Sequence, residues 1–149
     1  MKFEITKIDA AVDQIDWAIK LFLDQSAYVS AITLACAAEE IIGQSLGKSS
    51  AIRVAKESSE ANDEKMGSGL SEPCFGKEAN WVMRLRDMAD DEKVAIELET
   101  EAIQNIVKAI TTLFSYDQSL SSESPRFLQW LNKNKPEILN GLEFQGSPW

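Results

Sequence analysis

Apolar residues recur every three or four positions through most of the chain, which is the spacing of one face of an α-helix. The clearest run extends from Ile5 to Asp24, and its first apolar face consists of Ile5, Ile8, Val12, Ile15, Ile19 and Phe22. A second stripe of Ala10, Trp17 and Leu21 falls roughly opposite the first. A helix with two apolar faces is expected to be central in its fold or to face a second subunit.

The same spacing predicts further helices later in the chain. Gln25 and Ser26 interrupt the pattern and offer an N-cap for the second helix. The predicted helices span about 27–46, 77–88, 98–116 and 126–132. Gly47 ends the first of these, and Ser124 and Pro125 precede the last, after which Pro136 opens one more turn. In the span 77–88 the inward residues are Trp81, Val82, Leu85 and Met88. No stretch shows the alternation that is typical of a strand.

These elements predict an all-α fold, an antiparallel bundle of four to five helices in which sequence neighbours pack together. A chain of 149 residues fits one domain with its own core. We expect a single helical domain over residues 1–140. Within it, residues 48–76 are expected to be a weakly structured connection, because apolar positions are sparse and glycine and proline gather there. Residues 141–149 are expected to form a loose C-terminal tail.

Charge and composition limit the partners and the location. The chain has 24 acidic and 15 basic residues, a formal net charge of −9. This makes a nucleic acid an unlikely partner, because such proteins neutralise phosphates with lysine and arginine. No apolar run reaches the ~20 residues that span a bilayer, and the N-terminus does not resemble a signal peptide. Cys36 lies in an apolar run and Cys74 in a loop, without a CxxC pair, so we expect two reduced thiols in a cytoplasmic protein that makes no membrane contact.

The chain contains no histidine. Its absence excludes Ser-His-Asp and Cys-His catalytic arrangements, general-base catalysis by imidazole, and HExxH metal sites on a helix. A glycine-rich phosphate loop is also missing, because Gly67-Ser68-Gly69 follows no strand and lacks the P-loop lysine. Several common classes of enzyme are thereby removed.

Two pairs of carboxylates have the spacing of a magnesium site, Glu57 with Glu60 and Asp87 with Asp90. Carboxylates at i and i+3 share a helix face and can hold Mg²⁺ through oxygen ligands. The all-α nucleotide pyrophosphohydrolases use two such pairs. The match is poor, because the first pair lies in a serine-rich stretch and the second has aspartate where glutamate is expected. We therefore expect a solvated helix and a capped turn here, and we assign neither a metal nor a cofactor.

The most informative local feature is Glu39 followed by Glu40. On a helical wheel Glu39 falls inside the apolar face of the second helix, and Glu40 falls at its rim. An ionised carboxylate buried without a partner costs several kcal/mol, so it pairs or takes up a proton. In one interpretation Glu39 meets a cation such as Arg84 or Arg86, or a helix N-terminus, and sets the register of the bundle. In the other it lines a polar cleft with a raised pKa and is functional.

The stretch from Ile8 to Gly43, and above all the run Ala37–Ile41 before that glycine, resembles small bacterial proteins related to the HEPN superfamily (higher eukaryote and prokaryote nucleotide-binding domains). Asn80-Trp81, the acidic turn at residues 90–91 and the helix through Ile110 are also similar, so the resemblance covers about two thirds of the chain. It implies an all-α, HEPN-like bundle that forms a homodimer.

Many HEPN members are metal-independent ribonucleases. Their motif is an arginine, a polar residue such as asparagine, and a histidine four to six residues after the arginine. The resemblance places these three positions at Ala79, Asn80 and Arg84. Both the arginine and the histidine are therefore missing, and an arginine at the third position can bind an anion but cannot act as a base. The resemblance predicts the fold and argues against ribonuclease activity.

The leading expectation is a non-catalytic, HEPN-like interaction or small-ligand-binding module with a protein partner as one possibility. Its cleft is expected near Glu39, Glu40, Asn80 and Arg84. The alternative is an enzyme, either a residual HEPN-type ribonuclease or a magnesium-dependent nucleotide pyrophosphohydrolase. In a dimer, the stripe of Trp17 and Leu21 could supply part of the interface, since aromatic residues suit interface cores, or it could cover helices of its own chain.

Overall fold

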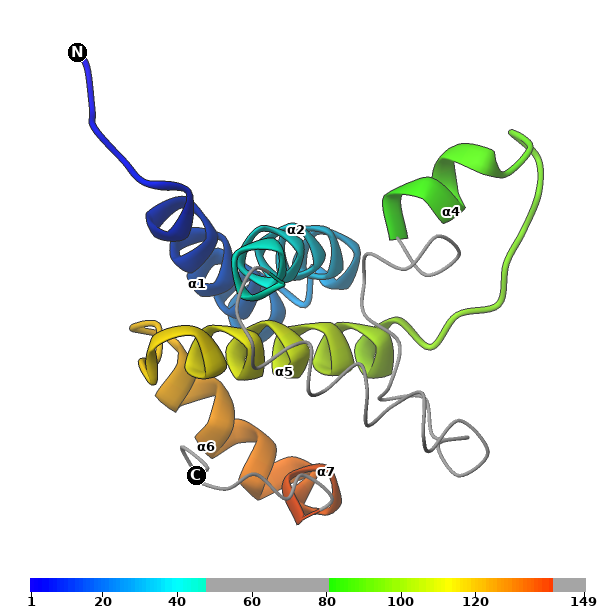
Figure 1. The fold of residues 1–149 in the computed structure, drawn as a ribbon. Coiled ribbons are helices and arrows are strands. Elements are labelled where there is room, and N and C mark those ends of the chain that lie inside the picture. Colours follow the sequence, from blue (N-terminus) through cyan, green and yellow to red (C-terminus); the bar gives the residue numbers. More distant parts are fainter. Residues whose placement is uncertain (48–80, 141–149) are drawn as a thin grey trace, which may run out of the picture.

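The computed structural model describes residues 1–47 and 81–140, and all regular structure in these two ranges is helical (Figure 1). The prediction of an all-α fold is confirmed for this part of the chain. The helices are α1 (Lys7–Gln25), α2 (Tyr28–Leu46), α4 (Trp81–Asp87), α5 (Leu98–Asp117), α6 (Ser124–Asn134) and α7 (Pro136–Asn140). The connection at 48–76 and the tail at 141–149 lie outside the described residues.

Helix α1 begins with a capping box, which makes its start later than the apolar pattern predicts. The Thr6 hydroxyl accepts a hydrogen bond from the Asp9 N–H at 3.0 Å, and the Asp9 carboxylate accepts one from the Thr6 N–H, also at 3.0 Å. These bonds satisfy two backbone donors that a helix otherwise leaves open, and they lower the pKa of Asp9. Ile5, expected on the core face, lies before the cap and is 69% exposed.

Ser26 ends α1 rather than starting α2. It adopts the left-handed conformation, with φ of 51°, and its N–H donates to the carbonyl of Leu21. The N-cap of α2 is Ala27, which makes no side-chain capping bond, so the predicted N-cap at Ser26 is wrong. A left-handed residue closes the carbonyl end of a helix and reverses the chain sharply. The two-residue connection therefore lays α2 back against α1.

Helix α2 lies between α1 and α5 (Figure 1). In the described ranges it is also the one helix that has the length and apolar composition to cross a membrane, contrary to the expectation that no run is long enough. Half of that stretch is buried inside the fold. Its apolar character is accounted for by contact with two helices on different sides, which is the usual reason for a helix that is apolar over most of its surface.

The directions of the packed helices differ from those expected in the predicted antiparallel bundle. Helices α1 and α2 are antiparallel, but α2 and α5 run in the same direction (Figure 1). Two contacts show this: the Tyr28 hydroxyl donates to Glu99 at 3.3 Å, and farther along both helices the Cys36 thiol donates to Asn105 at 3.2 Å. Short loops force neighbours to alternate, whereas the connection between α2 and α5 spans residues 47–97 and can return the chain to the same end.

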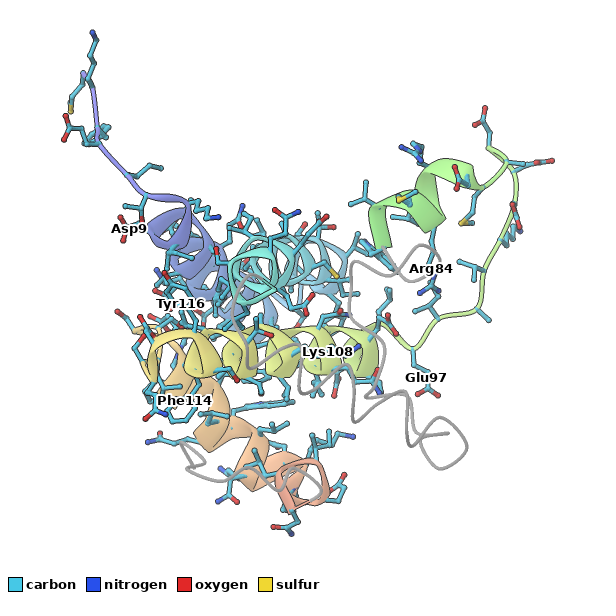
Figure 2. All side chains as sticks on the ribbon, in the orientation of Figure 1. Asp9, Arg84, Glu97, Lys108, Phe114 and Tyr116 are labelled. Carbon is cyan, nitrogen blue, oxygen red and sulfur yellow. The ribbon has the colours of Figure 1, made fainter. Side chains whose placement is uncertain are left out.

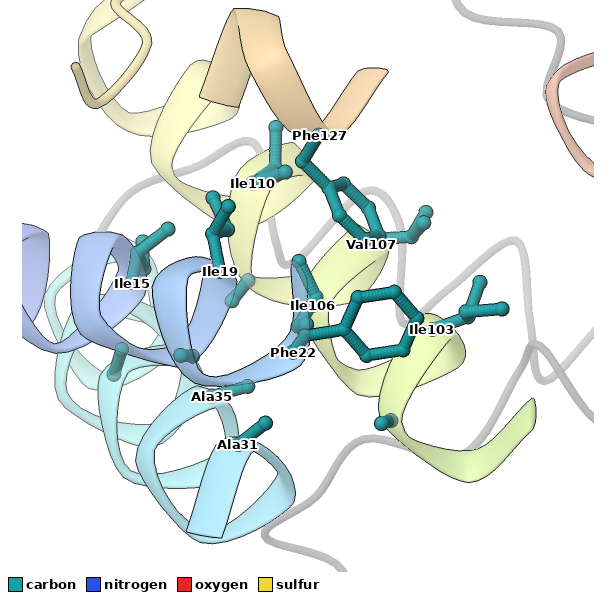
Figure 3. Close-up of a cluster of buried hydrophobic side chains, with 14 of the residues drawn as sticks. Ile15, Ile19, Phe22, Ala31, Ala35, Ile103, Ile106, Val107, Ile110 and Phe127 are labelled. Atoms are coloured by element: carbon teal, nitrogen blue, oxygen red, sulfur yellow. The ribbon is translucent and has the colours of Figure 1, made fainter. Parts of the chain in front are cut away.

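The core forms where α1, α5 and α6 meet over the small residues of α2 (Figure 3). Ala31 and Ala35 of α2 are fully buried, and their short side chains allow close approach of the neighbouring helices. The large side chains that fill the remaining space are listed here by helix: Ile15, Ile19 and Phe22 from α1; Ile103, Ile106, Val107 and Ile110 from α5; and Phe127 from α6. Ile15, Ile19 and Phe22 belong to the first apolar face predicted for the run from Ile5 to Asp24, so that prediction is confirmed for these three residues.

Polar contacts attach α6 to α1 at the surface. The Arg126 guanidinium donates two parallel hydrogen bonds to the Asp24 carboxylate, at 2.8 and 3.0 Å, and a third to Glu123 at 2.8 Å. The Arg126 hydrogen bond holds the pKa of the Asp24 carboxyl below its usual value. Asp16, about two turns earlier in α1, accepts the backbone N–H of Glu123 at 2.9 Å. These bonds position the start of α6 along α1.

The C-terminal helices follow their sequence signals. Helix α6 has Pro125 in its first turn, as predicted, and runs two residues farther than expected at each end. Ser124 is buried and shares a 2.6 Å hydrogen bond with the Ser121 hydroxyl. Pro136 opens α7, which confirms the predicted extra turn, because proline suits the first turn of a helix where no N–H partner is needed.

Candidate functional site

The interface between α2 and α5 contains three buried polar side chains, which we call the polar seam: Cys36 and Glu39 of α2 and Asn105 of α5. They are 5%, 6% and 5% exposed. Cys36 and Glu39 are three positions apart and share the helix face that meets α5. Most of the surrounding interface is aliphatic, so the seam marks a place where the two helices meet through specific polar contacts.

Asn105 makes hydrogen bonds at both ends of its amide, one across to α2 and one within α5. The amide oxygen accepts the Cys36 thiol at 3.2 Å, and the amide nitrogen donates to the backbone carbonyl of Glu101 at 2.7 Å. Buried polar groups that find partners favour the one packing register in which those partners meet. An amide oxygen is not a base, so the hydrogen bond to Asn105 holds the Cys36 thiol in position and does not itself activate it as a nucleophile.

The predicted burial of Glu39 is confirmed, and Glu40 lies half-buried at the rim as predicted. The suggested partners of Glu39, Arg84 and Arg86, are engaged elsewhere. Arg84 lies 3.8 Å from the Glu101 carboxylate, and Arg86 lies 3.5 Å from the adjacent Asp87. Both arginines are on the exposed side of α4, so the cation expected beside Glu39 is not supplied by this helix.

Helix α4 approaches the start of α5 and packs lightly on α2 (Figure 1). Trp81 is its buried residue, and its indole Nε1 donates no hydrogen bond within the described part of the chain. The Arg84 guanidinium lies 5.9 Å from the Trp81 ring centroid and points from α4 toward the beginning of α5, where Glu101 lies (Figure 2). Trp81 and Arg84 therefore dock α4 beside the polar seam.

The inward face predicted for this helix is wrong for Val82 and Leu85, which are exposed, whereas Trp81 is buried and Met88, just beyond the helix, is half-buried. Met83 is exposed as well, and we call Val82, Met83 and Leu85 the α4 apolar face. An isolated apolar residue on a surface is ordinary, but adjacent ones on a helix rim more often mark an interaction surface. Two arginines, Arg84 and Arg86, are interspersed with them. The α4 apolar face is therefore apolar with a cationic border.

The structure does not bring together the carboxylates of the candidate magnesium site. Asp87 is the last residue of α4, and Asp90 lies in the turn beyond it, so the two do not share a helix face. The turn at residues 90–91 is confirmed, with Glu92 accepting the Ala89 N–H at 3.0 Å. Glu57 and Glu60 lie outside the described residues. Among residues 1–47 and 81–140, no three acidic or cysteine side chains gather in a way that could hold a metal ion.

Of the four residues predicted for the site, Glu39 and Glu40 lie on α2, Arg84 lies on α4, and Asn80 falls outside the described residues. Sequence reasoning missed Asn105. The signal for it was present, because Asn105 stands between Ala102 and Ala109 at helical spacing, inside the apolar seam of α5. A polar residue at a core position was recognised in α2 and overlooked in α5.

Comparison of the chain with protein-family models, with curated proteins and with solved structures finds no match. The site therefore has to be interpreted from its own chemistry: a buried polar seam, a docked tryptophan and arginine, and an apolar face with a cationic border.

Proposed function

We propose that this chain is a HEPN-like, non-catalytic module that works in the cytoplasm as a homodimer and binds a protein partner on the face formed by α4 and the adjoining parts of α2 and α5. The observation that carries the proposal is the exposed α4 apolar face beside the polar seam. A helix that presents Val82, Met83 and Leu85 to solvent gains free energy when a partner covers them. The two arginines at its border suit a partner with acidic groups around an apolar centre.

The chemistry of the site supports binding over catalysis. No histidine is present in the whole chain, and the HEPN resemblance implies that Arg84 stands at the position of the ribonuclease histidine. That guanidinium keeps its proton at neutral pH, so it can stabilise an anion but cannot take a proton from a ribose 2′-hydroxyl. A small anionic ligand beside Arg84 is a second candidate, since the Arg84–Glu101 distance of 3.8 Å leaves the guanidinium free to reorient.

The homodimer is supported by the second apolar stripe of α1. Trp17 is 50% exposed, with the Lys20 ammonium 4.6 Å from its ring centroid, and Leu21 and Ala10 are half-buried. The described helices of the same chain do not cover Trp17. Because aromatic residues are enriched in interface cores, this stripe is suited to contact with the same stripe of a second copy.

The partner site is tested by substitution on α4. Immobilised chain is exposed to cell extract in three forms: native, Leu85→Gln, and Tyr116→Gln as the control. Tyr116 is an exposed apolar residue at the opposite end of α5 from α4 (Figure 2). A protein retained by the native and control forms is expected to be retained at least fivefold less by Leu85→Gln. Equal retention by all three forms, or retention of nothing by any form, contradicts the proposal.

The absence of catalysis is tested with RNA. Incubation of purified protein with single-stranded RNA in EDTA is expected to give no cleavage above the buffer control, because the chain lacks a group that titrates near neutral pH at the motif position. Denaturing gel electrophoresis measures the products over a range of protein concentrations. Cleavage that increases with protein concentration, and that co-elutes with the protein in a final gel-filtration step, would show that the chain is a nuclease.

A further inference from the structure

The first residues of the chain form an extended arm that leaves the helices (Figure 1). We call residues 1–5 the N-terminal arm. Its apolar side chains, Met1, Phe3 and Ile5, alternate with Lys2 and Glu4, and Phe3 is 78% exposed. In an extended chain successive side chains point to opposite sides, so the three apolar side chains share one side of the arm. The arm therefore presents an uncovered apolar edge to solvent.

The beginning of α1 directs this arm outward. Thr6 has an extended backbone, with φ of −87° and ψ of 165°, and both capping-box bonds hold it there. The arm consequently continues away from α1 and on the side opposite to α6 and α7 (Figure 1). The described helices of its own chain do not cover the arm, since Met1, Phe3 and Ile5 are all exposed. A second molecule is the more accessible site for its apolar side.

A groove of matching character lies between α6 and α7. It has a volume of about 600 Å³, and its described lining consists of Leu120, Pro125, Leu128, Gln129, Asn132, Leu139 and Asn140. The leucines provide an apolar floor, and the three carboxamides can each donate and accept hydrogen bonds, as the backbone of an extended peptide requires. None of these lining residues is charged. The groove therefore suits a short, extended peptide whose buried side is apolar and uncharged, which describes the side of the arm that carries Phe3.

Two-fold pairing through α1 would bring the arm to this groove. Trp17 lies near the middle of α1. If two copies pair through Trp17 about a two-fold axis perpendicular to α1, the two α1 helices are antiparallel, and the start of α1 in one copy lies opposite the end of α1 in the other. The end of α1 is where Asp24 holds Arg126 in the first turns of α6. Five extended residues span about 17 Å, and the stretch from Pro125 to Asn132 spans about 12 Å of helix. The arm is long enough to follow the groove.

We propose that the N-terminal arm of each protomer docks in the α6–α7 groove of a second copy, with Phe3 among the leucines and the backbone against the carboxamides. This inference rests on the proposed homodimer and specifies a contact that completes it. Each dimer would contain two identical arm-to-groove contacts, one at each end of the paired α1 helices.

The experiment measures the dimer dissociation constant by analytical ultracentrifugation, with all variants in the full chain. Native protein is expected to sediment at twice the 16.6 kDa of the chain. Phe3→Asp in the arm and Asn132→Glu in the groove are each expected to raise the dissociation constant at least tenfold. Val94→Asp, which alters an exposed valine in the link between α4 and α5, is the control and should leave it unchanged.

Mixing the two variants provides the decisive comparison. Neither variant homodimer contains an intact arm-to-groove contact, but a mixed dimer contains one, formed by the native arm of the Asn132→Glu chain and the native groove of the Phe3→Asp chain. The mixture is therefore expected to dimerise at least threefold more tightly than either variant alone. The other contact in the mixed dimer joins two acidic groups and cannot account for such a gain.

Each other outcome counts against the proposal. Native dimers that persist unchanged with Phe3→Asp overturn the arm contact and leave the α1 pairing standing, whereas monomeric native protein overturns both. If Phe3→Asp and Asn132→Glu each weaken dimerisation but their mixture dimerises no more tightly than either alone, the arm binds a surface other than the groove. If Asn132→Glu lowers thermal stability but not dimerisation, the groove belongs to a segment of the same chain. Gln129→Glu, which keeps side-chain shape, replaces Asn132→Glu if circular dichroism shows that the latter loses helix.

Discussion

Replacing Phe127 by alanine is expected to lower the free energy of unfolding by about 3–5 kcal/mol, the largest loss that we expect from a single substitution in this chain. Phe127 is fully buried. Its ring packs edge-on against Phe22, with centroids 5.6 Å apart, and stacks with Trp130 at 6.2 Å. It also lies where α1, α5 and α6 meet (Figure 3), so the cavity left by alanine would open at the junction of three helices and could not collapse without moving α6.

Urea denaturation followed by circular dichroism measures this effect, with Tyr116→Ala as the control. Tyr116 loses a ring of similar size from the exposed end of α5, where little packing is lost, so a change of less than about 1 kcal/mol is expected. At a slope of about 2 kcal/mol per molar urea, this loss lowers the unfolding midpoint of Phe127→Ala by about 1.5–2.5 M. Equal stability of the two variants would mean that Phe127 does not anchor α6.

Replacing Glu39 by leucine is expected to change the free energy of unfolding by less than about 1 kcal/mol, whereas alanine at the same position should lower it by about 2 kcal/mol or more. Glu39 is buried in the polar seam. Leucine keeps most of the side-chain volume and removes the cost of burying a carboxylate, which offsets the loss of its polar interactions. Alanine removes the volume as well and leaves a cavity between α2 and α5.

Thermal and urea denaturation compare the two variants, with Glu40→Leu and Glu40→Ala as the matched pair at the half-buried rim. The two Glu40 variants should differ from each other by less than the two Glu39 variants do. A Glu39→Leu protein that is less stable than Glu39→Ala would contradict the volume argument. Glu39→Leu also separates the two interpretations of Glu39. If this variant still binds the protein partner of the α4 face, the role of Glu39 is structural; if it no longer binds that partner, the role is functional.

The periodic part of the fold was predictable because its signals are local. The apolar spacing places α2, α5 and α6 within a few residues of their observed ends, and Pro125 and Pro136 mark the first turns of α6 and α7. The start of α1 was misplaced because the apolar pattern continues through Ile5, while the capping box of Thr6 and Asp9 ends the helix first. A Thr-x-x-Asp cap is itself a sequence signal, so this error was avoidable.

The candidate site was predictable only in part. Burial of Glu39 follows from the pattern of one helix, because a residue inside an apolar face is buried together with that face. The position of Arg84 does not follow from that helix, because Arg84 lies on a segment joined to α2 by a long connection and is placed beside Glu101 of α5 instead. Val82 and Leu85 of the α4 apolar face were predicted to point inward but are exposed, since periodicity says that apolar residues share a side and not whether another helix covers that side.

The amino-acid sequence by itself determined that this protein is helical, where most helices lie, which residues form the seams of α1, α2 and α5, and that imidazole chemistry is excluded. These properties depend on residue type and on spacing within about twenty positions. The tertiary structure decided that α2 and α5 run in the same direction, that Asn105 meets Cys36, that the α4 apolar face remains exposed, and that a groove opens between α6 and α7. Each of these depends on which distant segments meet, and long connections leave that choice to packing across the whole chain.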